Sequence, residues 1–143
     1  MPVSKIHIFF IALLFLVIND SCKKKEDVVP NVYVNFSIFL GDPEFATLQT
    51  IGNYVFVTGG VSGIVLYRYS QTEFFALDRC CTYKPSDRCA VLPDTSNTLF
   101  LKCPCCGSQF SYIYGDVQSG QAERALTNYN AVFDGNNTLH VYN

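Results

Sequence analysis

Residues 103–110 have the sequence Cys-Pro-Cys-Cys-Gly-Ser-Gln-Phe, and this short stretch guides the interpretation of the whole chain. A Cys-Pro-x-Cys-Gly turn is typical of a metal knuckle, because the proline bends the chain just after the first thiolate. The glycine then lets the backbone fold back, so that amide groups face the sulfurs. We therefore expect a metal-binding or otherwise sulfur-based site at this turn.

A second group of cysteines precedes the turn. Cys80, Cys81 and Cys89 lie upstream, so six of the seven cysteines fall between positions 80 and 106. Four thiolates suit Zn²⁺ or an iron–sulfur cluster, since both favour soft ligands. Disulfide pairing is the competing interpretation for an exported domain with this many cysteines. Spacing alone leaves these alternatives open.

Composition limits the class of protein. The chain has 143 residues, which allows one ordinary domain, and its hydrophobic content of 49% excludes a disordered tail. The net charge of −2, with only 15% charged residues, argues against a nucleic-acid partner, which would require a clustered basic face. Twelve Phe and nine Tyr favour a β-rich core, since aromatic side chains pack well on a pleated surface.

The pattern of apolar residues predicts an all-β domain. Val32, Val34, Phe36, Ile38 and Leu40 alternate with polar residues, which is the period of a half-buried strand. Short strands separated by glycine turns indicate a sandwich or small barrel. We predict strands at residues 32–40, 48–51, 54–58, 64–68, 74–78 and 98–102, and a closing hairpin from 131–133 and 138–141.

The N-terminal residues resemble an export signal. Residues 6–18 are thirteen mostly apolar residues, and as a helix they would reach about 20 Å, short of a ~30 Å hydrocarbon core. Residues 1–21 are therefore predicted to be a signal peptide. The Ser21-Cys22 step resembles the lipobox of bacterial lipoproteins, although Asn19 replaces the usual aliphatic residue.

This resemblance implies that Cys22 carries lipid, that residues 22–31 form a tether, and that residues 32–143 form one domain. The implied location is the outer membrane, facing the periplasm or the cell surface, with the lipid as membrane anchor. A plain secretory signal with an incidental Cys22 and a transmembrane anchor are the alternatives.

From Phe75 to Val141 the chain resembles a Rieske ferredoxin domain. That family has Cys-x-His in a first loop and Cys-x-x-His in a second loop, followed by Gly-Ser-x-Phe. The corresponding stretches here are residues 81–83, 103–106 and 107–110, with a further match at residues 120–122. The resemblance implies an antiparallel Rieske-like β-sandwich or small barrel in which two Cys-bearing loops form a metal-knuckle subdomain. It also implies a [2Fe-2S] cluster.

Both histidines of the family pattern are absent. Tyr83 stands at the first histidine position and Cys106 at the second. The first loop, which reads Cys-x-Tyr, is similar to that of a group of Rieske-like bacterial lipoproteins. The only histidines are His7 and His140, so an iron site with two imidazole ligands cannot form. Thiolates in their place would lower the potential from a range of about −150 to +300 mV toward roughly −400 mV.

The predicted metal ligands are Cys81, Cys89, Cys103 and Cys106. Ser108 is expected to donate a hydrogen bond to a sulfur, and Tyr83 to lie beside the ligands. Cys80 and Cys105 remain as spare thiols or disulfide partners. In Rieske proteins of respiratory complexes, a further cysteine of the first loop is bonded to the middle residue of the second. That middle residue is Cys105 here, and Cys89 is a possible partner.

Two functions follow from this reasoning. The first is a lipid-anchored iron–sulfur protein that passes single electrons to an envelope redox partner. It would be a redox carrier rather than a catalyst, because no oxygenase iron site is visible. The alternative is a cluster-free structural or binding lipoprotein whose cysteines hold zinc or form disulfides.

Overall fold

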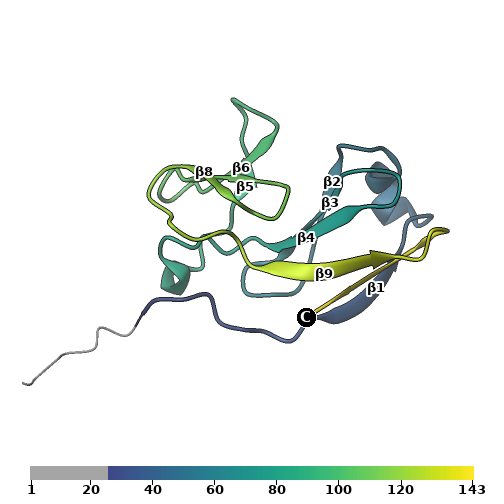
Figure 1. The fold of residues 1–143 in the computed structure, drawn as a ribbon, viewed down its shortest axis with the longest axis horizontal. Coiled ribbons are helices and arrows are strands. Elements are labelled where there is room, and N and C mark those ends of the chain that lie inside the picture. Colours follow the sequence, from purple (N-terminus) through teal and green to yellow (C-terminus); the bar gives the residue numbers. More distant parts are fainter. Residues whose placement is uncertain (1–25) are drawn as a thin grey trace, which may run out of the picture.

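The computed structural model describes residues 26–143. The predicted signal peptide, the proposed lipid site at Cys22 and the first part of the tether lie outside the described residues. Between positions 26 and 143, no helix is both long and apolar enough to cross a membrane. The described chain is built from two antiparallel sheets (Figure 1).

The larger sheet has six strands in the order β1-β10-β9-β4-β3-β2. Each pair of neighbouring strands is antiparallel, and β4 joins β9 through the pairs Ala76–Tyr129 and Leu77–Asn128. The strands are β1 (Asn35–Phe39), β2 (Tyr54–Val57), β3 (Ile64–Arg68), β4 (Phe74–Asp78), β9 (Asn128–Phe133) and β10 (Thr138–Tyr142).

The smaller sheet is inserted between β4 and β9 in the sequence and lies at one end of the larger sheet (Figure 1). Its order is β5-β6-β7-β8, and it carries two loops: the first loop (residues 79–91) precedes β5, and the second loop (residues 103–108) joins β6 to β7. The strands are β5 (Leu92–Pro93), β6 (Phe100–Lys102), β7 (Gln109–Ser111) and β8 (Val117–Ser119).

Strands β3 and β4 separate two hydrophobic cores. Successive side chains of a strand point to opposite faces, and here both faces are buried. Leu66 and Ala76 belong to the core of the larger sheet, whereas Val65 and Leu77 belong to the core under the smaller sheet. The second core also includes Cys81 and Cys103, so the sulfur-bearing loops begin from a packed interior.

Most of the predicted strands are confirmed, including the 54–57, 64–68 and 74–78 segments and the closing hairpin. The strand predicted at 48–51 is wrong, because residues Pro43–Gln49 form a 3-10 helix, η1, with Leu48 as its buried residue. Pro43 starts η1, and its fixed φ favours a helical first turn. The first strand is shorter than predicted and begins at Asn35.

A buried carboxylate fixes the end of β4, where the first loop begins. Asp78 is fully buried, and its oxygens accept hydrogen bonds from the backbone N–H groups of Val61 (2.6 Å), Ser62 (3.2 Å) and Cys80 (2.8 Å). The hydroxyl of Tyr129, on β9, donates a fourth hydrogen bond at 2.8 Å. The carboxylate therefore joins three separate segments of the chain.

Gly60 makes this arrangement possible. Its φ is +60°, and a Cβ atom at this position would lie 2.2 Å from Asp78 Oδ2. Any side chain would therefore push the 60–62 segment away from the carboxylate and break its hydrogen bonds.

We expect Asp78→Ala to lower the free energy of unfolding by about 3 kcal/mol or more, because it leaves several buried donors without an acceptor. Tyr129→Phe removes one hydroxyl and leaves the backbone donors paired, so it should cost about 1 kcal/mol. Urea denaturation of the metal-free protein measures both. Equal losses for the two variants would contradict a central role for the carboxylate.

Candidate metal centre

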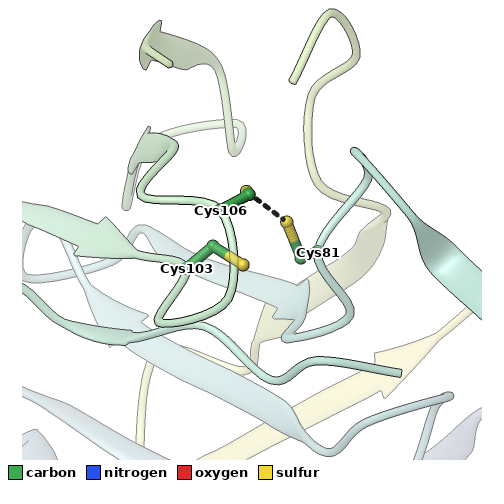
Figure 2. Close-up of side chains that lie close together, drawn as sticks. All are labelled: Cys81, Cys103 and Cys106. Atoms are coloured by element: carbon green, nitrogen blue, oxygen red, sulfur yellow. Dashed lines mark hydrogen bonds between the residues drawn. The ribbon is translucent and has the colours of Figure 1, made fainter. Parts of the chain in front are cut away.

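Three cysteine sulfurs from the two loops converge. Cys81 comes from the first loop, and Cys103 and Cys106 come from the second (Figure 2). Their Sγ atoms all lie within 4.8 Å of one another, and the Sγ atoms of Cys81 and Cys106 are 3.5 Å apart. We call these three thiols the sulfur site. They confirm that the two loops bring cysteines together.

Local hydrogen bonds give each loop its shape. In the second loop, Cys103 N–H donates to the Ser108 carbonyl and Gly107 N–H donates to the Cys103 carbonyl, each at 2.8 Å. Gly107 has a φ of +76°, a conformation that glycine adopts without strain. In the first loop, Cys81 N–H donates to the Cys89 carbonyl at 2.9 Å. The predicted knuckle turn is therefore present in the second loop.

Cys89 differs from its predicted role as a metal ligand. It forms a disulfide with Cys105, with a Cα–Cα distance of 6.4 Å, so neither residue offers a free thiolate. The bond connects the two loops, as in the pairing that the family resemblance offered as an alternative. Cys89 Sγ nevertheless lies 3.7 Å from Cys103 Sγ, next to the sulfur site. Of the four predicted ligands, Cys81, Cys103 and Cys106 are therefore free thiols, and Cys89 is oxidised in a disulfide.

Cys80 is a free thiol, one of the two roles that the sequence left open for Cys80 and Cys105, whereas Cys105 is a disulfide partner. Cys80 is fully buried, and its sulfur contacts the carbonyl oxygen of Pro85 at 3.6 Å. Burial raises the pKa of the Cys80 thiol above its ordinary value. Cys80 helps to position the first loop instead, because its backbone N–H donates a hydrogen bond to the Asp78 carboxylate.

Ser108 contacts a sulfur of the site, in the place where the sequence predicted it. Its Oγ lies 3.2 Å from Cys106 Sγ and accepts hydrogen bonds from the backbone N–H groups of Gln121 and Ala122, each at 2.9 Å. A hydroxyl has two acceptor lone pairs and one hydrogen to donate. The protonated Cys106 thiol donates to this oxygen. A Cys106 thiolate can only accept, so the Ser108 hydrogen is then directed to Cys106.

The close approach of residues 121 and 122 to Ser108 requires a glycine. A Cβ atom on Gly120 would lie 2.4 Å from Ser108 Cα, and its φ is +100°. The Gly-Gln-Ala stretch noted in the sequence therefore has a structural task, which is to bring two backbone donors to the Ser108 hydroxyl.

The pKa values of the Cys81 and Cys106 thiols are shifted in opposite directions. Burial, followed by the neighbouring Cys103 thiol, raises the pKa of Cys81 well above its ordinary value. Burial also opposes ionisation of Cys106, but hydrogen bonds from Ser108 outweigh it and hold the pKa of Cys106 below its ordinary value. Cys106 is therefore the more readily ionised of the two sulfurs that face each other.

A small cavity of about 80 Å³ opens beside the sulfur site. Tyr83, the residue at the first histidine position, lines this cavity and is 39% exposed, so its side chain lies at the rim. Lys84 and Asp87 are the charged residues of the lining. Tyr83 thus lies beside the three thiols, where the sequence predicted it.

The three thiols of the sulfur site are the kind of ligand that a thiolate-bound metal centre requires. Iron–sulfur clusters and structural zinc both bind thiolates, and each needs four protein ligands. Cys81, Cys103 and Cys106 supply three of them, and Cys89 is the nearest further sulfur. A fourth thiolate therefore requires reduction of the Cys89–Cys105 disulfide.

The sequence did not identify the residues of the larger sheet that anchor the start of the first loop. Asp78 ends the predicted strand 74–78 and Tyr129 precedes the predicted strand 131–133, and neither is predicted to anchor a loop. A carboxylate at the end of an apolar run, directly before Arg79 and two cysteines, is the signal that could have identified a buried anchor. Gly60 lies between the predicted strands 54–58 and 64–68, where the sequence indicates only a glycine turn.

Comparison with known proteins agrees with the resemblance seen in the sequence. A family model described as "Rieske [2Fe-2S] domain" matches residues 42–130. No curated protein sequence matches the chain. Among solved structures, the chain is similar to the crystal structure of the cyanobacterial plasma membrane Rieske protein PetC3 from Synechocystis PCC 6803. The sequences are 25% identical, the TM-score is 0.54, and the match covers 75% of this chain and 97% of that one.

We expect Ser108→Ala to raise the pKa of Cys106, because the variant loses the hydrogen bond that favours the thiolate. Alkylation of Cys106 by iodoacetamide near pH 7 should slow by about tenfold, the effect of a hydrogen bond of about 1.4 kcal/mol. The rates should become equal once the pH exceeds both pKa values, since only the thiolate reacts. The measurement is alkylation of Cys106 followed by mass spectrometry over a range of pH.

Ser108→Thr keeps the hydroxyl and should restore the rate. Ser111→Ala is a matched control, because the Ser111 hydroxyl accepts from Ile113 N–H within its own turn. A Ser108→Ala rate equal to that of the parent at pH 7 would refute the assigned hydrogen bond.

Proposed function

We propose that this chain, which belongs to the Rieske [2Fe-2S] domain family, is an iron–sulfur electron-transfer protein whose cluster is bound by cysteines. The observation that supports the proposal is the convergence of Cys81, Cys103 and Cys106 from two loops at the positions where the family binds its cluster. When bound, such a cluster takes up and releases single electrons.

The chain's own residues would hold and shield the cluster. Cys81 and Cys103 are 2% and 1% exposed, so the core side of the site excludes water, whereas Cys106 lies at the open side. Cys89 would complete a four-thiolate set after its disulfide is reduced. Ser108 Oγ lies 3.2 Å from Cys106 Sγ, and its hydroxyl would donate to a Cys106 thiolate and stabilise the negative charge on that sulfur.

The donor set supports a low potential. Neither loop contains a histidine, so the ligands would carry more negative charge than a pair of imidazoles does. Extra negative charge stabilises the oxidised cluster and moves the potential toward roughly −400 mV. Proton transfer coupled to a titrating imidazole is absent for the same reason.

A second candidate function rests on the Cys89–Cys105 disulfide. A bond that already connects the two loops can stabilise them without a metal. In this alternative the domain is a cluster-free structural or binding protein whose remaining thiols hold zinc or form further disulfides.

Iron, zinc and acid-labile sulfide, measured per chain on protein purified without oxygen, distinguish these functions. We expect two iron and two sulfide per chain with visible absorption, which are lost in Cys103→Ser because a ligand is removed. Cys80→Ser is the matched control, since Cys80 is an equally buried cysteine outside the sulfur site, and it should keep the colour. One zinc without sulfide, or no metal at all, would reject the cluster in favour of the second candidate.

We further propose that the protein is anchored to the outer membrane through lipid on Cys22 and acts with an envelope redox partner. The apolar residues 6–18 and the Ser21-Cys22 step support the lipid anchor, because together they resemble a lipoprotein export signal. The first described residues after Cys22 dock onto the domain. Glu26 forms an ion pair with Arg124 at 2.8 Å, and the Asp27 carboxylate accepts from the Ser86 hydroxyl at 2.8 Å.

We expect the parent protein in the membrane fraction and Cys22→Ala in the soluble fraction, because the variant has no site for acyl chains. Fractionation of cells, with incorporation of labelled palmitate, measures this. Cys80→Ser should behave like the parent. A Cys22→Ala protein that stays with the membrane would contradict the lipid anchor, and protease treatment of whole cells reports which side the domain faces.

A further inference from the structure

Two free thiols of the sulfur site face each other across the two loops. The Sγ atoms of Cys81 and Cys106 are 3.5 Å apart, and Figure 2 shows the two side chains directed toward each other. A disulfide bond is about 2.05 Å long, so the sulfurs need to approach by about 1.5 Å. The two loops are already held together nearby by the Cys89–Cys105 disulfide, which limits how far they can separate.

We propose that Cys81 and Cys106 form a two-electron dithiol–disulfide couple in the metal-free chain. The couple would give the domain a thiol–disulfide exchange activity, distinct from the one-electron role of a cluster. The inference does not depend on the proposed iron–sulfur function, because it concerns sulfurs that carry no metal. It extends that function, since the same two sulfurs would alternate between binding a metal and binding each other.

Differences in exposure determine the order of the steps. All three thiols of the sulfur site line the 80 Å³ cavity, but Cys81 is 2% exposed and Cys103 is 1% exposed, whereas Cys106 is partly exposed. An external disulfide can therefore reach Cys106 first, and Cys81 is the buried sulfur that completes the reaction.

The reaction balances with a small-molecule or protein disulfide as the oxidant. The Cys106 thiolate attacks one sulfur of the external disulfide, forms a mixed disulfide and releases one thiolate. The Cys81 thiol then loses its proton and attacks Cys106 Sγ, which forms the Cys81–Cys106 bond and releases the second thiolate. Two protein thiols lose two electrons and two protons, and the external disulfide becomes two thiols.

The other free thiols are less suited to pair with Cys106. Cys80 is fully buried, and its sulfur contacts the Pro85 carbonyl rather than another thiol. Cys103 shares the sulfur site and lies within 4.8 Å of both sulfurs, but its Sγ is also 3.7 Å from Cys89, which is already bonded to Cys105, whereas the Cys81 and Cys106 sulfurs are 3.5 Å apart. The pair that remains is Cys81 and Cys106.

Trypsin makes the couple directly measurable. Cleavage after Arg79, Arg88, Lys102 and Arg124 releases three peptides, residues 80–88, 89–102 and 103–124. The existing disulfide joins peptide 89–102 to peptide 103–124, and the proposed disulfide adds peptide 80–88 to the same assembly. The metal-free full chain is equilibrated with mixtures of oxidised and reduced glutathione, trapped with acid and an alkylating reagent, digested, and analysed by mass spectrometry.

We expect one cooperative transition in which peptide 80–88 joins the assembly and two alkylated cysteines disappear. Cys106→Ser and Cys81→Ser should each abolish it. Cys80→Ser is the matched control and should keep it, because Cys80 is a buried free cysteine outside the sulfur site. Loss of the transition in Cys80→Ser, a shuffled Cys89–Cys103 bond in place of the expected one, or full alkylation of Cys81 and Cys106 in oxidised glutathione would overturn the proposal.

This experiment can fail separately from the test of the proposed function. Iron and sulfide are counted on protein purified without oxygen, whereas the couple is measured by cross-linked peptides on the metal-free chain. A protein with a cluster but no cross-link keeps the proposed function and loses this inference. A protein with the cross-link but no cluster loses the proposed function and keeps this inference.

Discussion

The Asp78 carboxylate lies out of contact with solvent and accepts hydrogen bonds from three backbone amides and one phenol. Those donors belong to the segment before β3, to the start of the first loop and to β9. A charge or a dipole buried without such partners would be costly, so these segments cannot separate without exposing or stranding polar groups. The first loop therefore starts at a fixed point, and the position of Cys81 follows from it.

The second loop is placed by different means, namely a knuckle turn and the Ser108 hydroxyl. Gly120 brings two backbone amides to that hydroxyl, which lies 3.2 Å from Cys106 Sγ and can donate its hydrogen to a Cys106 thiolate. The Cys89–Cys105 bond then joins the two loops. The result is a compact group of sulfurs on a rigid base, in which metal binding and sulfur–sulfur bonding would compete for the same atoms.

The sequence predicted the strand-rich architecture because residues 32–40 alternate, and because residues 54–57 and 64–68 are β-branched and aromatic runs beside glycines. Short elements escaped prediction: three residues, as in β7 and β8, are too few to show a period. In the site, the Cys-Pro-x-Cys-Gly turn identified Cys103 and Cys106 because their contacts are local. The roles of Cys89 and Asp78 depend on partners 16 and 51 residues away, and spacing along the chain carries little information about such contacts.

The docking of residues 26 and 27 has a consequence for where the domain can work. Arg124 and Ser86, which hold these residues, belong to the end of the molecule that carries the sulfur-bearing loops. Each exposed contact contributes little by itself. Three residues lie between Cys22 and Glu26, and the four steps along the chain have a covalent reach of about 14 Å. An acyl group at Cys22 would thus keep the thiols close to the lipid headgroups and direct them toward molecules that diffuse laterally in the bilayer, rather than toward those arriving from the bulk.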